Sequence, residues 1–239
     1  MARLTVVNLL PRLMGTYGDT GNELALSSRL KKRGIDAEFT RVEAGDVVPP
    51  SADLYLLGGG EDRAQPLAAS LIAEPLTRAL AEGAAVFAVC AGYQILGHSF
   101  TDSRGQTHAG LGVLDVVTRP MATRAVGEVV VNPGLPVDAI VGFENHRGRT
   151  RLGPNANPLG HVVAGVGNGD PLHSEGAVQG CIVATYLHGP VLALNPSLAD
   201  WVLSQIVGPL EPIDDSSAYR ARARRLNPVD RYRDALRQT

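Results

Sequence analysis

Two residues of this sequence, Cys90 and His188, have the types and surroundings that nucleophilic catalysis requires. Cys90 follows the short apolar run AAVFAV, and the small residues Ala91 and Gly92 after it permit a sharp turn into a helix that begins near Tyr93. Such a turn projects the side chain from the top of a sheet and places the sulfur at a helix N-terminus, whose partial positive charge favours thiolate over thiol. The pattern indicates a nucleophile elbow, although a free cysteine is most commonly a small buried hydrophobe.

A catalytic base must lie within hydrogen-bond reach of that thiol. Of the six histidines, His188 alone directly ends an apolar strand, IVATYLHG, and it is expected at the same sheet edge as Cys90. The others are expected to be surface or structural residues, except His146 in GFENHRGRT. That polar cluster would suit a substrate or interface loop as well as a plain exposed turn. Cys181 begins another apolar strand with no small-residue turn after it, and is expected in the core.

Attack of a thiolate on an amide generates an oxyanion, which needs fixed hydrogen-bond donors. Three glycines at 58–60 follow a neighbouring strand, and glycine lets the main chain approach a ligand closely. The backbone N–H groups of Gly60 and Ala91 are the candidate donors. The GGG run fits neither the GxGxxG nor the GxxxxGK phosphate-binding pattern, and no CxxC or HExxH spacing predicts a metal site.

The elements that must position these residues alternate between short apolar strands and amphipathic helices. Strands that are apolar at every position predict a mostly parallel sheet covered on both faces, with ligands at the carboxyl ends of the strands. Between residues 110 and 164 the pattern changes to short strands and turns, which predicts additional β segments. The expected strands span 4–10, 37–42, 53–57 and 84–89, and the expected helices span 22–33, 65–82 and 196–206.

Length and composition fit one α/β domain over residues 1–210, followed by a basic tail over 211–239. The 239 residues are 44% apolar, and the net charge of −2 gives no reason to expect nucleic-acid binding. Two distant cysteines, no signal-peptide pattern and no apolar run of about 20 residues predict a cytoplasmic protein without membrane insertion. The tail carries seven arginines from Tyr219 onward, with Pro228 interrupting its helical pattern. It is interpreted either as a solvated surface helix or as a docking arm for a partner.

Taken together, DLYLLGGG, FAVCAGYQILG and TYLHGP, in that order, resemble the class I, or triad, glutamine amidotransferases. The resemblance is closest to the cobyric acid synthase-like type, and within it to the stand-alone glutaminase subunits of lipid II isoglutaminyl synthases. YGDTGN, GGGEDRAQ and GFENHRGRT point to that group, and the resemblance covers essentially the whole chain. It implies the class I amidotransferase fold, with Cys90 attacking L-glutamine, His188 as the base and Gly60 in the oxyanion hole.

The same resemblance assigns substrate contacts and raises one question about the triad. It implies that Arg124, in TRAVGEVV, binds the α-carboxylate of glutamine as a planar donor fork, and that Gln94, in CAGYQ, lies among the substrate-binding residues. The carboxylate usually found two residues beyond the base is absent, because Pro190 stands there. Glu61 and Glu144 are candidates within the chain, but an aspartate donated by the partner subunit is favoured, so the isolated chain is expected to be weakly active.

The implied partner is a Mur ligase-like subunit that forms a heterodimer with this chain. It would bind ATP and Mg²⁺, since this sequence has no Walker-type loop, and would use the ammonia to amidate D-glutamate in the lipid II stem peptide. Three alternatives stay open. They are an amidotransferase for cobalamin precursor synthesis, a non-catalytic regulatory subunit, and a cysteine peptidase or related hydrolase built on the same elbow.

Overall fold

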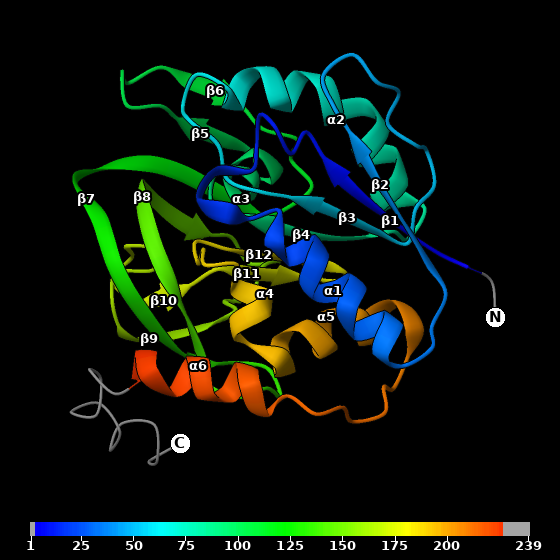
Figure 1. Ribbon diagram of the computed structural model, residues 1–239. Helices are drawn as coiled ribbons and strands as arrows, with labels where there is room; N and C mark the ends of the chain where they lie inside the picture. The colour runs from blue at the N-terminus through cyan, green and yellow to red at the C-terminus, as the bar shows by residue number, and fades with distance from the viewer. Residues whose placement is uncertain (1–2, 227–239) are drawn as a thin grey trace.

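The computed structural model describes residues 3–226, which form two β-sheets with helices packed around the first (Figure 1). The strands of the first sheet lie in the order β11-β12-β4-β3-β1-β2, and all neighbours are parallel except β11 and β12. In chain order they are β1 (Leu4–Leu9), β2 (Ala37–Val42), β3 (Leu54–Leu57), β4 (Ala85–Val89), β11 (Ala177–Gln179) and β12 (Ile182–Thr185). The mostly parallel α/β sheet expected from the sequence is confirmed.

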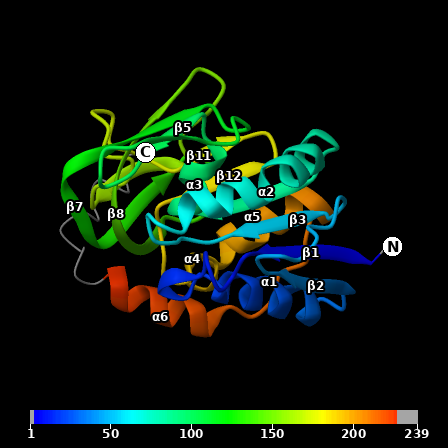
Figure 2. The same ribbon diagram turned by 90° about the horizontal axis from the view of Figure 1, so that it is seen from above.

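Helices cover both faces of this sheet, and α1 and α2 lie on opposite sides of β1 and β3 (Figure 2). Helix α1 packs with α4 and α5, while α2 packs with α3. Because both faces are covered, every residue of β3, β4 and β12 is buried, which explains why these strands carry apolar side chains at successive positions. The helices are α1 (Gly21–Lys32), α2 (Gln65–Ala81), α3 (Ala91–Leu96), α4 (Val191–Leu194) and α5 (Pro196–Val207), and η1 (Thr16–Gly18) is a 3₁₀ turn.

Four segments meet at the carboxyl edge of the parallel strands. The loop after β1 contains η1 and runs to Asp19, the loop after β3 begins with the three glycines at 58–60, β4 ends at Cys90, and β12 runs into His188. In a parallel sheet these strand ends lie at one edge, where open α/β folds bind ligands. The topology therefore brings together residues that are more than 160 positions apart in the sequence.

The second sheet is largely antiparallel and is dominated by a long ribbon of two strands. Its order is β10-β9-β7-β5-β6, with β8 paired to β7. The segments GVLDVV and GEVVVN, expected as separate short strands, contribute to the single strand β7, whose pairing shifts register between Pro120 and Ala125. The strands are β5 (Ser99–Thr101), β6 (Thr107–Ala109), β7 (Val116–Pro133), β8 (Ile140–Leu152), β9 (Gly160–Ala164) and β10 (Ser174–Glu175).

The described part of the basic tail, helix α6 (Ser216–Leu226), packs against the chain's own β-ribbon (Figure 1). The Tyr219 hydroxyl donates to Asp138 at 2.7 Å, and Arg225 donates to both carboxylate oxygens of Glu128 at 2.8 and 2.9 Å. Arg222 is buried against the carbonyl of Ala139. For residues 216–226 the solvated-helix interpretation is therefore incomplete, while the remainder of the tail, 227–239, lies outside the described residues.

Within residues 3–226, none of the helices combines the length and the apolar character needed to cross a bilayer.

Candidate active site

Cys90 occupies a strained turn between β4 and α3. Its backbone has φ +52° and ψ −105°, a conformation that non-glycine residues rarely adopt. The Cys90 N–H donates to the carbonyl of Thr185 at 2.8 Å, and its carbonyl accepts from the N–H of Gln94 at 3.1 Å. Gly92 is needed beneath the turn, because a Cβ there would lie 2.6 Å from the carbonyl oxygen of Leu57. The elbow expected from the sequence is present, with its sulfur at the N-terminus of α3.

His188 is held at the same edge by both sheets. Its backbone exchanges two hydrogen bonds with Phe143 of β8, with N···O distances of 2.8 and 3.1 Å. The side chain is 1% exposed, and its Nδ1 lies 2.9 and 3.0 Å from the two carboxylate oxygens of Asp19. Its Nε2 has no hydrogen-bond partner among the described residues. Cys90 is one of the groups that shift the pKa of His188.

Asp19 is the acid that sequence reasoning did not identify. Its side chain is fully buried, and besides meeting His188 it accepts the backbone N–H of Gly59 at 2.8 Å. The structure therefore offers an acid within the chain, whereas the sequence analysis favoured an aspartate donated by the partner. Glu61 lies on the pocket wall without bonding to His188, and Glu144 is occupied by the backbone amides of 166 and 167.

The sequence did contain a signal for Asp19. It lies in YGDTGN, a segment noted for its family resemblance, and in a loop that leaves β1 at the same sheet edge as Cys90 and His188. What the local pattern could not reveal is the return of this loop over the sheet. Leu10 and Tyr17 both adopt positive φ, at 53° and 59°, and these turns help set its path.

The three side chains share a charge arrangement suited to proton transfer. Burial by itself disfavours a charged His188, but the hydrogen bond with Asp19 and the proximity of Cys90 outweigh it and raise the pKa of His188 to about 10. The imidazole therefore carries a positive charge at neutral pH. A cation beside a cysteine favours the thiolate, the form that acts as nucleophile.

Gly59 forms the surface on which these three residues converge. A Cβ built at Gly59 would lie 2.8 Å from Cε1 of His188, 3.1 Å from a carboxylate oxygen of Asp19 and 3.3 Å from Cβ of Cys90. The first distance is shorter than real Cβ contacts, so one side chain would have to move. The glycine is thus required by close approach to the site.

For the glutaminase reaction that the sequence resemblance implies, Gly59→Ala is expected to lower kcat by roughly 10² through displacement of His188, since misplacing a catalytic group by about 1 Å has effects of that size. Steady-state ammonia release measures the loss. Gly83→Ala is a suitable control, because a Cβ there meets no atom within 4 Å. Alanine is strained at the φ of +101° at Gly83, but this strain is away from the site. Equal activity of the two variants would contradict the proposed crowding.

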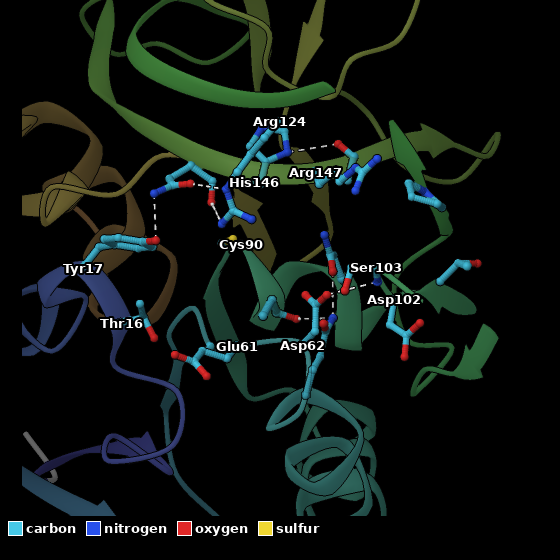
Figure 3. A pocket seen from close by; sticks show the side chains of 18 of the residues that line it. Thr16, Tyr17, Glu61, Asp62, Cys90, Asp102, Ser103, Arg124, His146 and Arg147 are labelled. Carbon is cyan, nitrogen blue, oxygen red and sulfur yellow. Dashed lines mark hydrogen bonds between the residues drawn. The ribbon is translucent and has the colours of Figure 1, made fainter. Parts of the chain in front are cut away.

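The site opens into a pocket of about 500 Å³. In Figure 3, Cys90 lies between Arg124 and His146 on one side and Glu61 and Asp62 on the other. The arginines Arg124 and Arg147 and the carboxylates of Glu61 and Asp62 thus line different parts of the pocket. This arrangement suits a small zwitterion such as an amino acid.

Gly60 and Ala91, the candidate oxyanion donors, both line this pocket. The N–H of Gly59 is already donated to Asp19, which leaves Gly60 as the donor of the glycine run that faces the site. Ala91 is the first residue of α3, where backbone N–H groups have no partner within the helix. The geometry is therefore compatible with a two-donor oxyanion hole.

Arg124 belongs to a hydrogen-bonded network over the pocket. It lies where β7 and β8 lose register, and its Nε donates to the side-chain oxygen of Asn145 at 2.5 Å. The amide nitrogen of Asn145 donates to the hydroxyl of Tyr17 at 2.7 Å, and the Tyr17 ring contacts His188 edge-on, with centroids 4.9 Å apart. Sequence reasoning missed Tyr17 and did not assign Asn145 an individual role, since neither adjoins a strand end of the first sheet.

Gln94 and His146 line the pocket but are also engaged with the protein. The side-chain oxygen of Gln94 accepts from Gln65 at 2.8 Å, and its nitrogen donates to Tyr186 at 3.1 Å. His146 is buried, stacks on Tyr186 with centroids 3.8 Å apart, and lies 3.0 Å from the carbonyl oxygen of Gly148. GFENHRGRT is therefore part of β8 and of the pocket wall, and the interpretation as a plain exposed turn is wrong.

Other sequence-based assignments lie away from the site. Cys181 was expected in the core but is exposed, because it precedes β12 directly after the turn at Gly180, whose φ is +57°. His98 and His108 interact with Asp115 and Asp102, at 3.1 and 3.2 Å. Among residues 3–226, no group of three or more metal-ligating side chains is close enough to hold an ion.

Glu175 is a buried acid beneath the segment that carries His188. One of its oxygens accepts from the Thr185 hydroxyl and from the Tyr186 N–H, the latter at 2.9 Å, and the other has no hydrogen-bond partner within the described residues. Burial, partly offset by these hydrogen bonds, raises the pKa of Glu175 from 4.5 to about 7. A carboxyl with a raised pKa stabilises the fold fully below its unfolded pKa, and this contribution is lost as pH rises through the folded value.

Glu175→Gln is expected to remove this pH dependence, because the amide keeps the accepting oxygen and cannot ionise. Between pH 4 and 8 the free energy of unfolding of the wild type should fall relative to the variant by roughly 3 kcal/mol, as a rise in the pKa from 4.5 to about 7 implies. Urea unfolding at several pH values measures this difference. Parallel pH profiles for the two proteins would show that Glu175 ionises normally.

Comparison with known proteins identifies the family. Residues 5–196 match the model of the CobB/CobQ-like glutamine amidotransferase domain, so the chain belongs to this family of glutamine amidotransferases. Its relatives include the lipid II isoglutaminyl synthase (glutamine-hydrolyzing) subunit GatD of Staphylococcus aureus, 35% identical over 93% of this chain and 94% of the relative. The subunit of the same name from Streptococcus pneumoniae is 33% identical over 82% and 78%. A cobyric acid synthase of Pelotomaculum thermopropionicum is 37% identical, over 58% of this chain and 30% of its own length.

Solved structures share the fold at low sequence identity. A crystal structure of a glutamine amidotransferase superposes with a TM-score of 0.55 and 21% identity, covering 84% of this chain and 98% of that one. The glutaminase domain of Trypanosoma brucei CTPS with bound acivicin gives a TM-score of 0.53 at 11% identity, covering 87% and 96%. The class I glutamine amidotransferase fold expected from the sequence is confirmed.

Proposed function

We propose that this chain is the glutaminase subunit of a lipid II isoglutaminyl synthase. It hydrolyses L-glutamine and delivers the ammonia to a Mur ligase-like partner, which amidates the α-carboxylate of D-glutamate in the lipid II stem peptide. The observation that carries the chemical part is the convergence of Cys90, His188 and Asp19 on one pocket. The acceptor is supported by near full-length similarity to two subunits of that name.

The proposed reaction uses Cys90 as nucleophile and His188 as the proton carrier. The sulfur attacks the side-chain amide carbon of glutamine, and the oxyanion is stabilised by the N–H groups of Gly60 and Ala91. The C–N bond then breaks, and the nitrogen leaves as ammonia with a proton from His188, which leaves a γ-glutamyl thioester. Water that loses its proton to His188 hydrolyses the thioester. Asp19 fixes the tautomer of the imidazole and supports its positive charge.

Arg124 is proposed to bind the α-carboxylate of glutamine, because it lines the pocket and Asn145 orients its guanidinium group by accepting from Nε at 2.5 Å and from Nη2 at 3.3 Å, which leaves Nη1 for the substrate. Arg124→Lys is expected to raise KM tenfold or more with little change in kcat, since a hydrogen bond to a charged group contributes about 1.5–3 kcal/mol. Ammonia release measured against glutamine concentration gives both constants. For 4-aminobutanamide, which lacks the α-carboxylate, the variant should lose little; an equal loss there would contradict the assignment.

The Mur ligase-like partner is proposed to hold ATP and Mg²⁺ and to act with this chain as a cytoplasmic heterodimer. With Asp19 already bonded to His188, the physical reason for expecting a weakly active isolated chain disappears. The same observation removes the support for a non-catalytic regulatory subunit, which rested on the missing acid. Synthesis of cobalamin precursors is less well supported, because the match spans 30% of the cobyric acid synthase from Pelotomaculum thermopropionicum.

The test follows the nitrogen atom of glutamine. The purified chain is supplied with [amide-¹⁵N]glutamine, first alone and then with the Mur ligase-like subunit, ATP, Mg²⁺ and lipid II. We expect ammonia release in both cases, and ¹⁵N in the stem-peptide amide in the second. Ammonium chloride should support amidation by the partner without this chain. Absence of ammonia release both alone and with the partner would overturn the glutaminase proposal. Ammonia release without transfer of ¹⁵N to the stem peptide would overturn only the assigned acceptor.

A further inference from the structure

The outer face of the β7–β8 ribbon carries four arginines. Arg119 of β7 lies directly opposite Arg149 of β8, and Arg147 and Arg151 are the alternate neighbours of Arg149 on the same strand. All four are exposed. The intervening pair Thr118 and Thr150 points inward, with both residues buried and their hydroxyls 2.7 Å apart. We call these four residues (Arg119, Arg147, Arg149 and Arg151) the arginine face.

The charge of the arginine face is not balanced within the described part of the chain. None of the four side chains forms an ion pair with an acid among residues 3–226, and Arg147 bonds only to the carbonyls of Met121 and Ala122. Like charges directly opposite each other on paired strands are destabilising. The chain as a whole has a net charge of −2, so the arginine face is a local concentration of positive charge and not a general property.

The arginine face adjoins the mouth of the active-site pocket. Arg147 lines that pocket, as do Pro120 and Gly148, which pair directly with each other beside the Arg119–Arg149 pair. If ammonia is passed on without loss to solvent, the receiving protein must cover this mouth and therefore lie against the adjacent ribbon.

We propose that the arginine face is a docking surface for an acidic surface of the ammonia-accepting partner subunit. This inference rests on the proposed function, which requires such a partner. Guanidinium groups form paired hydrogen bonds with carboxylates, so a row of aspartates and glutamates fits four arginines on a flat ribbon. Complementary charge of this kind mainly speeds association and fixes the relative orientation of two proteins. A position next to the pocket favours a protein partner over an anionic membrane.

The test compares charge reversal on the arginine face with charge reversal elsewhere. Arg119→Glu/Arg149→Glu is expected to weaken binding of the Mur ligase-like subunit at least tenfold at 100 mM salt, with reduced salt dependence. The control Lys31→Glu/Lys32→Glu makes the same change in net charge on exposed positions of α1 and should bind as the wild type does. Neither Arg119 nor Arg149 lines the pocket, so glutamine hydrolysis by the isolated variants should be unchanged.

A single variant separates docking from folding. Arg119→Glu replaces a repulsive cross-strand pair by an attractive one, so the thermal midpoint of the isolated chain should stay equal or rise while affinity for the partner falls. Partner affinity equal to that of the wild type for the single and the double variant would overturn the proposal. If the double variant lost binding to phosphatidylglycerol vesicles but bound the partner as the wild type does, the proposal would also be overturned, in favour of a lipid surface. Failure of the glutaminase proposal would appear separately, as absence of ammonia release by the wild type.

Discussion

Asp19→Asn is expected to lower kcat for glutamine hydrolysis by roughly 10³–10⁴, with the fold retained. The carboxylate contacts Nδ1 of His188 at 2.9 and 3.0 Å and also accepts the Gly59 N–H. An asparagine has one oxygen that can accept a hydrogen bond where the carboxylate has two. Its NH₂ group donates instead, which favours the wrong imidazole tautomer. The equivalent change in a serine protease triad costs about 10⁴ in kcat.

The pH profile provides a second measurement of the same variant. Because Asp19 contributes to raising the pKa of His188 to about 10, its removal should shift the alkaline limb of kcat to lower pH. Glu61→Gln is the matched control, since this carboxylate lines the pocket without bonding to His188, and its kcat should be nearly unchanged. Full activity of Asp19→Asn in the isolated chain would refute the role of Asp19. Rescue of the variant only by the Mur ligase-like subunit would instead indicate that the partner supplies the acid.

Sequence reasoning located Cys90 and His188 because each follows a short strand that is buried at every position. Such strands are recognisable from their uninterrupted apolar residues, and the carboxyl ends of parallel strands meet at one edge. The small residues after Cys90 added a local signal for the elbow. These two catalytic candidates could therefore be paired across a long separation in sequence without knowledge of the coordinates.

Asp19 escaped because its position depends on the path of a loop. It lies 169 residues from His188 and ten residues beyond the end of β1, so no strand pattern reports its return to the sheet edge. Tyr17 and Asn145 escaped for a related reason, since Tyr17 lies in the loop after β1 and Asn145 in β8 of the second sheet, and the two meet at the pocket. Side-chain networks between a loop and a second sheet are tertiary features, and local propensity does not encode them.

The backbone of β7 explains another difference. Pro120 and Gly127, residues that usually weaken or interrupt strands, made this segment look like separate short strands. Pro120 lies directly before the register shift, and the long pairing with β8 continues beyond it. The irregularity also positions Arg124, which lies within the unpaired stretch, at the pocket.

Replacement of Cys90 should abolish glutamine hydrolysis, and the glycine variant should be more stable than the alanine variant. Both Cys90→Ala and Cys90→Gly lack the nucleophile, so ammonia release should fall to background. The two differ in the backbone cost of φ +52° and ψ −105°, which glycine tolerates and alanine does not.

Strain of this kind costs about 1–3 kcal/mol, and the greater freedom of glycine in the unfolded chain returns about 0.4–1 kcal/mol of that. Cys90→Gly should therefore have a free energy of unfolding roughly 1–2 kcal/mol above that of Cys90→Ala, measured by urea denaturation. At Gly83, where φ is +101° but no catalytic group is attached, Gly83→Ala should destabilise without loss of turnover. Equal stability of the two Cys90 variants would mean that the elbow stores no strain. The expected difference would show that the chain keeps a destabilising backbone at this one turn because the position of the sulfur depends on it.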